Sequence, residues 1–319
     1  MPKILTPRRS VLSAALAGVV MLGLTACSQP ASPAASGAAD QPKVALLLST
    51  LNNPFFVDVR DGAQDAAKSL GVDLEVSDAQ NDAATQSNQA ANALSAGAKA
   101  VIINAVDSKA AGPAVAPLVA AKIPVVAVDR AVEGATVNSF VASDNVAGGS
   151  QAAEALAKAL GENGKIIVLQ GVPGTSASND RGKGFTEKIA SYPGIKVVAS
   201  QTANFDRAQA LDVATNLLQA NPGVTGIFAE NDEMALGAIQ ALGDRAGKDV
   251  KVFGFDGTDD GLKAIKAGTM AGTIAQQPKE LGKKAVEFAA KLVKGESVEA
   301  VAPVPVTTIT AENVGDFLK

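Results

Sequence analysis

From Lys43 to the C-terminus, short apolar runs alternate with longer segments whose apolar residues follow a helical pattern. Several of the short runs are apolar without alternation, which is typical of strands that are covered on both faces of a parallel sheet. Regular alternation of strands and helices predicts a doubly wound α/β fold. We expect strands at 44–49, 73–77, 100–104, 125–128, 139–142, 165–170, 196–200, 226–229, 250–254 and 272–275.

The expected helices have recognisable ends. Gly71, Gly97 and Gly161 each follow a helical segment, and glycine readily adopts the left-handed conformation that often ends a helix. Pro54 and Pro278 lie where a first helical turn would begin, a position at which the missing N–H of proline breaks no hydrogen bond. These residues separate the helices from the strands around them.

A repeated order of elements predicts two lobes. Residues 44–76 read as strand, polar loop, helix with Arg60, glycine and strand, and residues 166–198 repeat this order with Arg181 in the helix. The alternative is one sheet of ten strands, but sheets of that size usually curl or split. We therefore expect two similar lobes, each built on its own sheet.

The N-terminus has the pattern of an export signal. Lys3, Arg8 and Arg9 precede an apolar stretch at 11–24, which is too short for a membrane-spanning helix. The stretch ends in Leu-Thr-Ala-Cys, which is similar to the lipobox of bacterial lipoproteins, so we expect a lipid on Cys27. The alternative is a buried apolar hairpin with a core cysteine, which the basic flank argues against. Arg8 and Arg9 also fit a twin-arginine signal loosely, so the export route stays open between that system and Sec.

Residues 1–26 are therefore expected to be removed as a lipoprotein signal peptide. Their removal takes away three positive charges, so the net charge falls from −4 to −7. Residues 27–42 are rich in Ser, Ala, Pro and Gly, a composition typical of a flexible tether. We expect the mature protein to be exported, to lie in the periplasm or at the cell surface, and to be held at the membrane by its lipid anchor only.

Composition excludes several classes of catalytic site. Hydrophobic residues make up 47% of the chain and charged residues 19%, which suits a folded protein with a sizeable core. The sequence has no histidine, which excludes a Ser-His-Asp nucleophile, a histidine base and a histidine-ligated metal site. A single cysteine excludes an internal disulfide and a multi-cysteine metal site. A net charge of −4 argues against nucleic-acid binding, and we expect no bound metal or cofactor.

Polar and aromatic residues follow the expected strands. Ligands of open parallel sheets bind beyond the carboxyl ends of the strands, so these residues are candidates for a binding site. Local explanations exist for each residue taken singly: Asn53 and Asn231 suit helix N-caps, and Asp129 with Arg130 suits a local ion pair. The candidate set is Ser49, Asn53, Phe55, Phe56, Asp129, Arg130, Arg181, Phe205, Asn231, Asp256 and Gln276.

The set as a whole suits a sugar. Carboxylates accept hydrogen bonds from hydroxyls, guanidinium groups donate to them, and amides do both. Phenyl rings cover the apolar C–H face of a sugar ring and exclude water. Two aspartates against two arginines balance the charge, which favours a neutral polyol over a phosphate or an amino acid.

Long, ordered motifs carry a resemblance to a known family. They are LSTLNNPFF (48–56), VDRA (128–131), ASDN (142–145), LQGVPGTSA (169–177), NDRGKGF (179–185), FDR (205–207), NDEMALGA (231–238), GFDGT (254–258) and TIAQQP (273–278). Through them the chain resembles the ribose-binding proteins of bacterial ATP-driven sugar importers, a ribose/galactose-type group of periplasmic binding proteins. The resemblance covers residues 43 to about 306.

This resemblance implies a site residue by residue. One lobe of the family supplies an Asn, paired Phe residues and an Asp-Arg pair. The other lobe supplies an Arg, a Phe, an Asn and an Asp, and a hinge supplies a Gln. Every position here has the family's residue type, which implies D-ribose as the ligand, with Ser49 as a minor contact. In that order, the matching residues are Asn53, Phe55, Phe56, Asp129, Arg130, Arg181, Phe205, Asn231, Asp256 and Gln276.

The chain departs from well-known relatives outside this set, at Ser178, Asn179 and 132–136. The lipobox also differs from freely soluble members of the family and implies a tethered form. These departures lie where partner docking or ligand affinity is expected to change.

The resemblance also implies the type I periplasmic binding protein fold: α/β, with two doubly wound parallel-sheet lobes joined by a three-segment hinge near 143–144, 276–277 and 304–306. In this family, ligand capture closes the lobes, the closed form delivers the sugar to a membrane permease, and a separate ATPase subunit drives transport. The chain has no GxxxxGK[ST] motif, which agrees with that division of labour. We expect a monomer that is not an enzyme, with a chemoreceptor as a further candidate partner. The expected lobes are 43–143 plus 277–305 and 144–276 plus 306–319.

Three other functions compete with this interpretation. A glycosidase would use Asp129 and Asp256 as its carboxylate pair, but neighbouring arginines are expected to lower their pKa values and leave no general acid. A transcription-regulator core has a similar fold, but an export signal precedes Lys43 in place of a helix-turn-helix. The third alternative is a binding protein for another small ligand: allose, galactose or a furanosyl signalling molecule.

Overall fold

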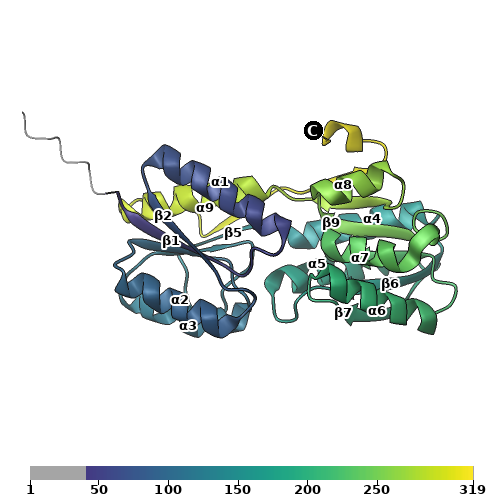
Figure 1. The fold of residues 1–319 in the computed structure, drawn as a ribbon, viewed down its shortest axis with the longest axis horizontal. Helices are drawn as coiled ribbons and strands as arrows, with labels where there is room; N and C mark the ends of the chain where they lie inside the picture. Colours follow the sequence, from purple (N-terminus) through teal and green to yellow (C-terminus); the bar gives the residue numbers. More distant parts are fainter. Residues whose placement is uncertain (1–40, 319) are drawn as a thin grey trace, which may run out of the picture. The chain divides into compact units, whose positions relative to one another are not determined.

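The computed structural model describes residues 41–318 and contains two α/β lobes (Figure 1). Cys27, the export signal and most of the expected tether lie outside the described residues, so the predictions made for them stay predictions. Within residues 41–318, no helix is both long enough and apolar enough to cross a membrane.

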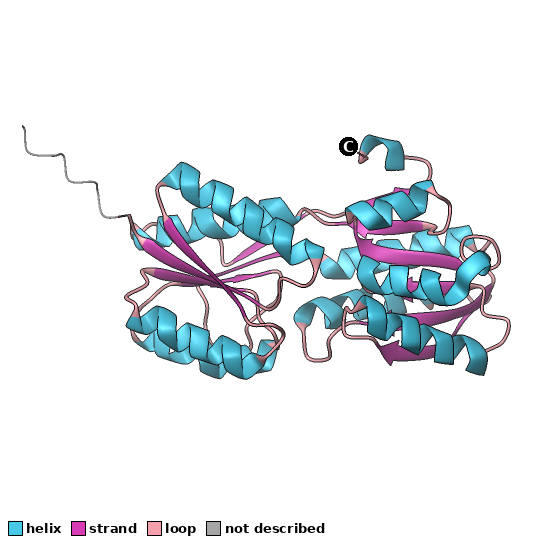
Figure 2. Ribbon diagram, in the orientation of Figure 1, coloured by secondary structure: helices cyan, strands magenta, loops and turns pink. Residues whose placement is uncertain are grey.

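The N-terminal lobe is a parallel sheet with helices on both faces (Figure 2). Its strands are β1 (Lys43–Leu48), β2 (Asp73–Asp78), β3 (Ala100–Ile103), β4 (Val125–Val128), β5 (Ser139–Ser143) and β11 (Val301–Val304). Its helices are α1 (Pro54–Leu70), α2 (Ala83–Ser95), α3 (Ser108–Ala120) and α9 (Pro278–Val293). The strand order is β11-β5-β4-β3-β1-β2. Helices α1 and α9 pack together over one hydrophobic cluster, and α2 and α3 pack over another.

The C-terminal lobe repeats this plan. Its strands are β6 (Gly164–Gln170), β7 (Ile195–Thr202), β8 (Gly226–Ala229), β9 (Lys251–Asp256), β10 (Gly272–Ala275) and β12 (Thr307–Thr310). Its helices are α4 (Asn145–Ala159), α5 (Ser176–Ile189), α6 (Arg207–Ala220), α7 (Asp232–Leu242) and α8 (Asp259–Lys266), with short 3₁₀ turns at Gly243–Arg245 and Val314–Asp316. The strand order is β12-β10-β9-β8-β6-β7, parallel except for β12, which is antiparallel to β10.

The chain passes between the two sheets three times. Strand β5 leads into α4, β10 leads into α9, and β11 leads into β12. Helix α4 contacts β9 and β10 of the second sheet, whereas α9 contacts β3 and β4 of the first. Each lobe therefore contains a helix that follows a strand of the other lobe. This topology confirms the two-lobe fold with a three-segment hinge and excludes the single ten-stranded sheet.

The pattern of apolar runs located ten of these strands and missed β11 and β12. Both missed strands lie at an edge of their sheet. Strand β11 reads Val-Ala-Pro-Val with alternate residues exposed, and β12 reads Thr-Thr-Ile-Thr with one fully buried residue, Ile309. An edge strand that buries few side chains needs no continuous apolar run. The predicted repeat is confirmed, since β1-α1-β2 and β6-α5-β7 occupy equivalent positions in the two sheet orders.

Helix α1 begins and ends at the signals that the sequence carries. The Asn53 side chain accepts a hydrogen bond from the Phe55 N–H at 2.9 Å, and Pro54 is the first helical residue. Gly71 ends the helix in the left-handed conformation, with φ of 66°. These ends place Asn53, Phe55 and Phe56 just beyond the carboxyl end of β1.

The position of α1 on the sheet depends on a close contact with α9. A Cβ atom at Gly62 would lie 2.1 Å from the Lys279 carbonyl oxygen, and one at Gly282 would lie 2.0 Å from the Val59 carbonyl oxygen. Only a hydrogen atom fits at either position. The two glycines therefore set the distance between the helices and, through α1, the position of its N-terminal phenylalanines.

The close contact predicts a specific sensitivity to an added methyl group. Gly282→Ala should push α9 away from α1 and lower the free energy of unfolding by about 1–3 kcal/mol, measured by urea denaturation. Gly315→Ala is the control, because a Cβ at Gly315 would contact nothing within 4 Å. Equal stability of the two variants would contradict this role of the close contact.

Candidate ligand-binding site between the lobes

Nine of the candidate residues surround one small cavity between the lobes. The N-terminal lobe supplies five of them and the C-terminal lobe supplies four. Ala177 on α5 also lines the cavity and was not expected, because an alanine carries no chemical signal in a sequence. The nine residues are Asn53, Phe55, Phe56, Asp129, Arg130, Arg181, Phe205, Asn231 and Asp256.

Two further candidates lie behind the cavity lining. The Gln276 amide donates a hydrogen bond to Asp256 Oδ1 at 2.7 Å, so Gln276 reaches the site through that carboxylate. The Ser49 hydroxyl donates to Asn104 Oδ1 at 2.6 Å. Asn104 in turn donates from Nδ2 to Asp129 Oδ2 at 3.3 Å. Asn104 was not among the candidates. It directly follows β3, and this position at a strand end could have identified it from the sequence.

Four buried charges dominate the cavity. Asp129, Arg130, Arg181 and Asp256 are between 2% and 5% exposed. Arg130 Nε lies 3.8 Å from Asp129 Oδ2, and Arg181 Nη1 lies 3.6 Å from Asp256 Oδ1. The charges therefore balance within each lobe, which a site for a neutral ligand requires.

Burial governs the protonation of these groups. It raises the pKa values of Asp129 and Asp256, and the nearby arginines oppose this without reversing it. Burial also lowers the pKa of Arg130 to about 10. The expectation that neighbouring arginines depress the aspartate pKa values was therefore wrong, because the loss of hydration outweighs the attraction. The argument built on it against a glycosidase does not hold.

Several polar atoms around the cavity have no partner within the protein. Asp129 Oδ1, Arg130 Nε and Gln276 Oε1 are buried and make no hydrogen bond to any of residues 41–318. Buried polar atoms of native proteins are nearly always satisfied, so unpaired donors and acceptors grouped at one place indicate a ligand with hydrogen-bonding groups of both kinds.

The backbone is strained at three of the candidate residues. Asp129, Phe205 and Asp256 have φ values of 64°, 58° and 127°, in a region that residues with side chains rarely adopt. Such strain persists where the surrounding structure enforces it and clusters at functional sites. Here it turns the chain sharply at the ends of β4, β7 and β9, so that the three side chains reach the cavity.

Asn53 and Asn231 combine the two roles that the sequence left open. Each caps a helix: Asn53 Oδ1 accepts from Phe55 N–H, and Asn231 Oδ1 accepts from the N–H of Met234 at 2.9 Å. Each also lines the cavity. Capping holds the amide group in one orientation, which prepares it for a ligand.

Aromatic rings and arginines pack against one another. The rings of Phe55 and Phe56 meet edge to face with centroids 5.2 Å apart. The guanidinium groups of Arg130 and Arg181 each lie 5.6 Å from the centroid of Phe205. The Phe255 ring also supports Arg181, 3.9 Å from its guanidinium carbon. Phe255 was not a candidate, because inside an apolar strand it is indistinguishable from core.

The lobes touch directly beside the cavity. The Ala131 N–H in the N-terminal lobe donates to Ser176 Oγ in the C-terminal lobe at 2.8 Å. The Ser176 N–H donates to Ser108 Oγ at 3.2 Å, and the Ser108 N–H donates to the Gly174 carbonyl at 3.3 Å. These hydrogen bonds exist only when the lobes are together, so the structure represents a closed form.

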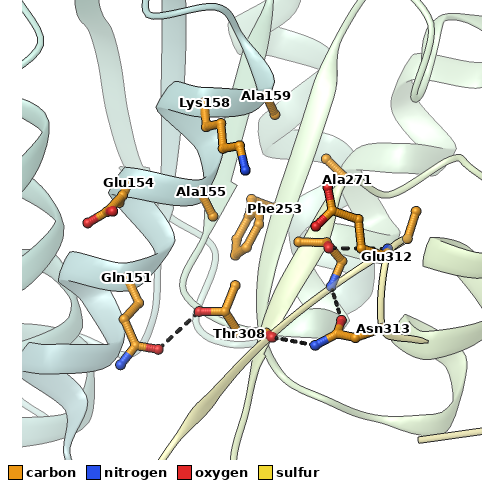
Figure 3. Close-up of a pocket in the computed structure, with 12 residues that line it drawn as sticks. Gln151, Glu154, Ala155, Lys158, Ala159, Phe253, Ala271, Thr308, Glu312 and Asn313 are labelled. Atoms are coloured by element: carbon orange, nitrogen blue, oxygen red, sulfur yellow. Dashed lines mark hydrogen bonds between the residues drawn. The ribbon is translucent and has the colours of Figure 1, made fainter. Parts of the chain in front are cut away.

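A larger hollow of about 650 Å³ lies within the C-terminal lobe, between α4 and β12 (Figure 3). Its polar groups pair with each other: Thr308 Oγ1 donates to Gln151 at 3.0 Å, and the Asn313 amide donates to the Thr308 carbonyl at 3.1 Å. Its charged residues Glu154, Lys158 and Glu312 are exposed. The hollow has no buried charge and none of the candidate residues, so the smaller cavity remains the candidate site. Within residues 41–318, no cluster of acidic or sulfur ligands suits a metal ion.

Comparison with known proteins confirms the resemblance. The model of the periplasmic binding protein domain matches residues 44–297. The ribose import binding protein RbsB of Salmonella typhimurium is 50% identical over 261 residues, which cover 82% of this chain and 88% of that protein. The protein of the same name from Haemophilus influenzae is 47% identical over 296 residues, covering 93% of this chain and 98% of the relative.

Solved structures share the fold as well as the sequence pattern. An ABC transporter solute-binding protein from Actinobacillus succinogenes, crystallised with bound D-allose, superposes with a TM-score of 0.81 at 35% identity and covers 86% of this chain and all of that one. The agreement extends over both lobes. The chain therefore belongs to the periplasmic binding protein family, with the type I architecture of two parallel-sheet lobes.

Proposed function

We propose that the protein is the extracytoplasmic binding subunit of an ABC importer and that it captures D-ribose between its lobes. The observation that carries the proposal is the lining of the cavity: two aspartates, two arginines, two asparagines and three phenylalanines from both lobes surround one small space. This is the combination of groups that a neutral, hydroxyl-rich ring requires. The remaining support comes from the relatives.

The charged residues are assigned the hydrogen bonds to the sugar. Asp129 and Asp256 accept from hydroxyls, and Arg130 and Arg181 donate to them. A hydrogen bond that involves a charged group contributes about 1.5–3 kcal/mol, and several of them in a dry cavity support tight binding. Asp129 Oδ1 and Arg130 Nε, which lack partners among residues 41–318, are assigned to the ligand directly.

The phenylalanines are assigned the apolar faces of the ring. Phe55 and Phe56 come from one lobe and Phe205 from the other, so a bound sugar contacts aromatic carbon from both lobes. Since the aromatic rings also contact both arginines, they hold the guanidinium groups in place.

Sequence similarity favours one sugar over the others. The ribose import binding proteins are more similar in sequence to this chain than the protein that holds D-allose, which favours D-ribose. The alternative within the same mechanism is allose, galactose or a furanosyl ligand.

Binding is coupled to closure of the lobes. A sugar that contacts both lobes stabilises the closed state by its differential affinity for that state. We propose that the lobes are 43–143 plus 277–305 and 144–276 plus 306–319, and that they move about the three crossings of the chain. The closed form then docks on a membrane permease, and a separate ATPase subunit drives transport.

We infer that the protein is not an enzyme. The named relatives are import binding proteins. We further propose a monomer that carries lipid on Cys27 and lies in the periplasm or at the cell surface, with a chemoreceptor as an additional partner. The support for the anchor is the Leu-Thr-Ala-Cys sequence at the end of the leader.

The primary test is isothermal titration of residues 41–319 with a panel of pentoses and hexoses. D-ribose should bind much more tightly than the other sugars. If another sugar binds tightly and D-ribose does not, that sugar is the ligand and the importer function stands. A folded sample that binds none of the panel would contradict a sugar-binding function.

The arginines are tested by truncation. Arg130→Ala and Arg181→Ala should each weaken ribose binding by about a hundredfold or more, because each removes charged hydrogen bonds in a dry site. Arg245→Ala, an exposed arginine on the same lobe as Arg181, is the matched control. If both cavity variants bind ribose with nearly the wild-type affinity, Arg130 and Arg181 do not contact the sugar.

The contact of Phe205 with the sugar is tested against a second phenylalanine, Phe317, as the control. Phe205→Ala should weaken ribose binding by about tenfold to a hundredfold through lost apolar contact, with the ligand-free protein still folded. Phe317→Ala, at a ring that is 39% exposed, should leave the affinity unchanged. If the two variants bind ribose equally well, Phe205 does not contact the sugar.

The hydrogen bonds between the lobes predict that ribose affinity also depends on Ser176, a residue that does not line the cavity. Ser176→Ala removes the acceptor for the Ala131 N–H and should weaken ribose binding by about fivefold, because the closed state loses about 1 kcal/mol. Ser191→Ala, which removes an exposed hydroxyl bonded only to the Lys188 carbonyl, is the control. Small-angle scattering should show less closure of Ser176→Ala at a given ribose concentration. Unchanged affinity and unchanged closure would show that this contact is dispensable.

A further inference from the structure

A buried carboxylate lies behind the C-terminal side of the cavity. Glu230 follows β8, directly before Asn231, and its side chain is fully buried. Glu230 Oε2 accepts hydrogen bonds from the Gly171 N–H at 2.7 Å and from the Ser178 hydroxyl. Glu230 Oε1 has no partner among residues 41–318. The side chain does not line the cavity, so ligand contact does not explain it.

Glu230 also contacts Arg181 through its main chain. The Glu230 carbonyl oxygen accepts a hydrogen bond from Arg181 Nη1 at 2.7 Å. Ser178 and Arg181 lie three residues apart on α5, which places them on the same side of that helix. One residue therefore contacts α5 at two points within its first two turns, at Ser178 and at the guanidinium group of Arg181.

The first turn of α5 has no local side-chain cap. Its N-cap residue is Thr175, whose hydroxyl donates to the Val172 carbonyl and accepts no hydrogen bond from the helix N–H groups. Helices α1 and α7, by contrast, are capped by the side chains of Asn53 and Asn231. The orientation of α5 at the cavity depends on long-range contacts, and Ser178 with Glu230 is one of them.

The same carboxylate holds the surface against which Phe205 packs. A Cβ atom at Gly171 would lie 2.0 Å from the Phe205 ring, so the ring lies directly on the Gly171 backbone. The Thr202 hydroxyl donates to the Gly171 carbonyl at 2.6 Å, and Glu230 accepts from its N–H. The position of Gly171 therefore determines how far the Phe205 ring extends into the cavity.

We propose that Glu230 is a positioning residue for sugar binding: by joining Ser178 on α5 to Gly171, it holds Arg181 and the Phe205 ring in the geometry that the sugar requires. This inference rests on the proposed function.

The ionisation of Glu230 provides a separate measurable effect, a change of protein stability with pH. Burial raises the pKa of the Glu230 carboxyl to about 7, opposed by the hydrogen bonds from Ser178 and Gly171 and by the charge of Arg181. Arg181 on α5 is the charged side chain that faces Glu230, and it contacts Asp256 at the end of β9. The uncharged Gly171, directly after β6, donates to the Glu230 carboxylate, and the uncharged Thr202, at the end of β7, contacts Gly171. Asp232, on α7, is bonded instead to Thr258 and Thr273.

The raised pKa of Glu230 determines whether the free energy of unfolding rises or falls with pH. A carboxyl group with a higher pKa in the folded protein than in the unfolded chain loses stability as it ionises. The contribution of Glu230 to the free energy of unfolding should therefore decrease as the pH rises from about 4.5 through about 7. Glu230→Gln removes this titration, so the difference between wild type and variant isolates it from the other buried carboxyl groups.

The test compares Ser178→Ala, Glu230→Ala and Glu230→Gln. Gln retains a carbonyl oxygen that accepts both hydrogen bonds, whereas Ala retains none. Ser178→Ala and Glu230→Ala should weaken ribose binding by about five- to tenfold, and Glu230→Gln should recover most of that loss. Hydrogen–deuterium exchange of the ligand-free protein should be faster at residues 176–181 in the two alanine variants. Ser191→Ala again serves as the matched control, and the mild Ser178→Ala keeps the test available if Glu230→Ala does not fold.

Three results would overturn the proposal. Ribose affinities within about twofold of wild type in Ser178→Ala and Glu230→Ala would show that the contact does not affect binding. Equal losses in Glu230→Ala and Glu230→Gln would show that the acceptor geometry is not what matters. Unchanged exchange at residues 176–181 would show that α5 is held in another way. If wild-type protein binds no sugar, the proposed function fails, while exchange in the ligand-free protein still decides whether Glu230 holds α5.

Discussion

The balance of buried charge between the lobes is the constraint on which the rest of the site depends. Two arginines and two aspartates are almost completely buried, and each pair lies within one lobe. Burial of unpaired ions costs several kcal/mol each, so the loss of one partner is expected to destabilise the lobe that contains it. Within a pair the attraction is incomplete, because the contacts are longer than 3.5 Å and several polar atoms stay unpaired among residues 41–318. Under the proposed function, a hydroxyl-rich ligand completes both pairs at once.

Sharp turns at the ends of parallel strands bring both aspartates and Phe205 to the cavity. Asp129, Phe205 and Asp256 all lie at positive φ, and this strain is maintained by the tightly packed strands and helices around them. Close helix contacts contribute as well, since α1 approaches α9 at two glycines and thereby places Phe55 and Phe56. Rigid elements thus fix the positions of these side chains at the cavity.

The C-terminal side of the cavity relies on contacts that are distant in the chain. Arg181 is held by Asn145 Oδ1 at 2.8 Å and by the Glu230 carbonyl, 36 and 49 residues away. Its α5 turn has no local cap, unlike the turns that carry Asn53 and Asn231. Within the C-terminal lobe, Asn231 is held by local capping, whereas Arg181 is held by a network that crosses from β8 to α5.

The sequence by itself determined the strand–helix rhythm, the two lobes and most of the cavity lining, because apolar runs, caps and strand-end residues act locally. Only the tertiary structure decided the rest. Strands β11 and β12 depend on a neighbouring strand for pairing, and Asn104, Phe255 and Glu230 acquire their roles from partners far along the chain. The rise in the aspartate pKa values was also decided there. Burial is a property of the assembled protein, and its effect on a charge has no counterpart in the order of residues.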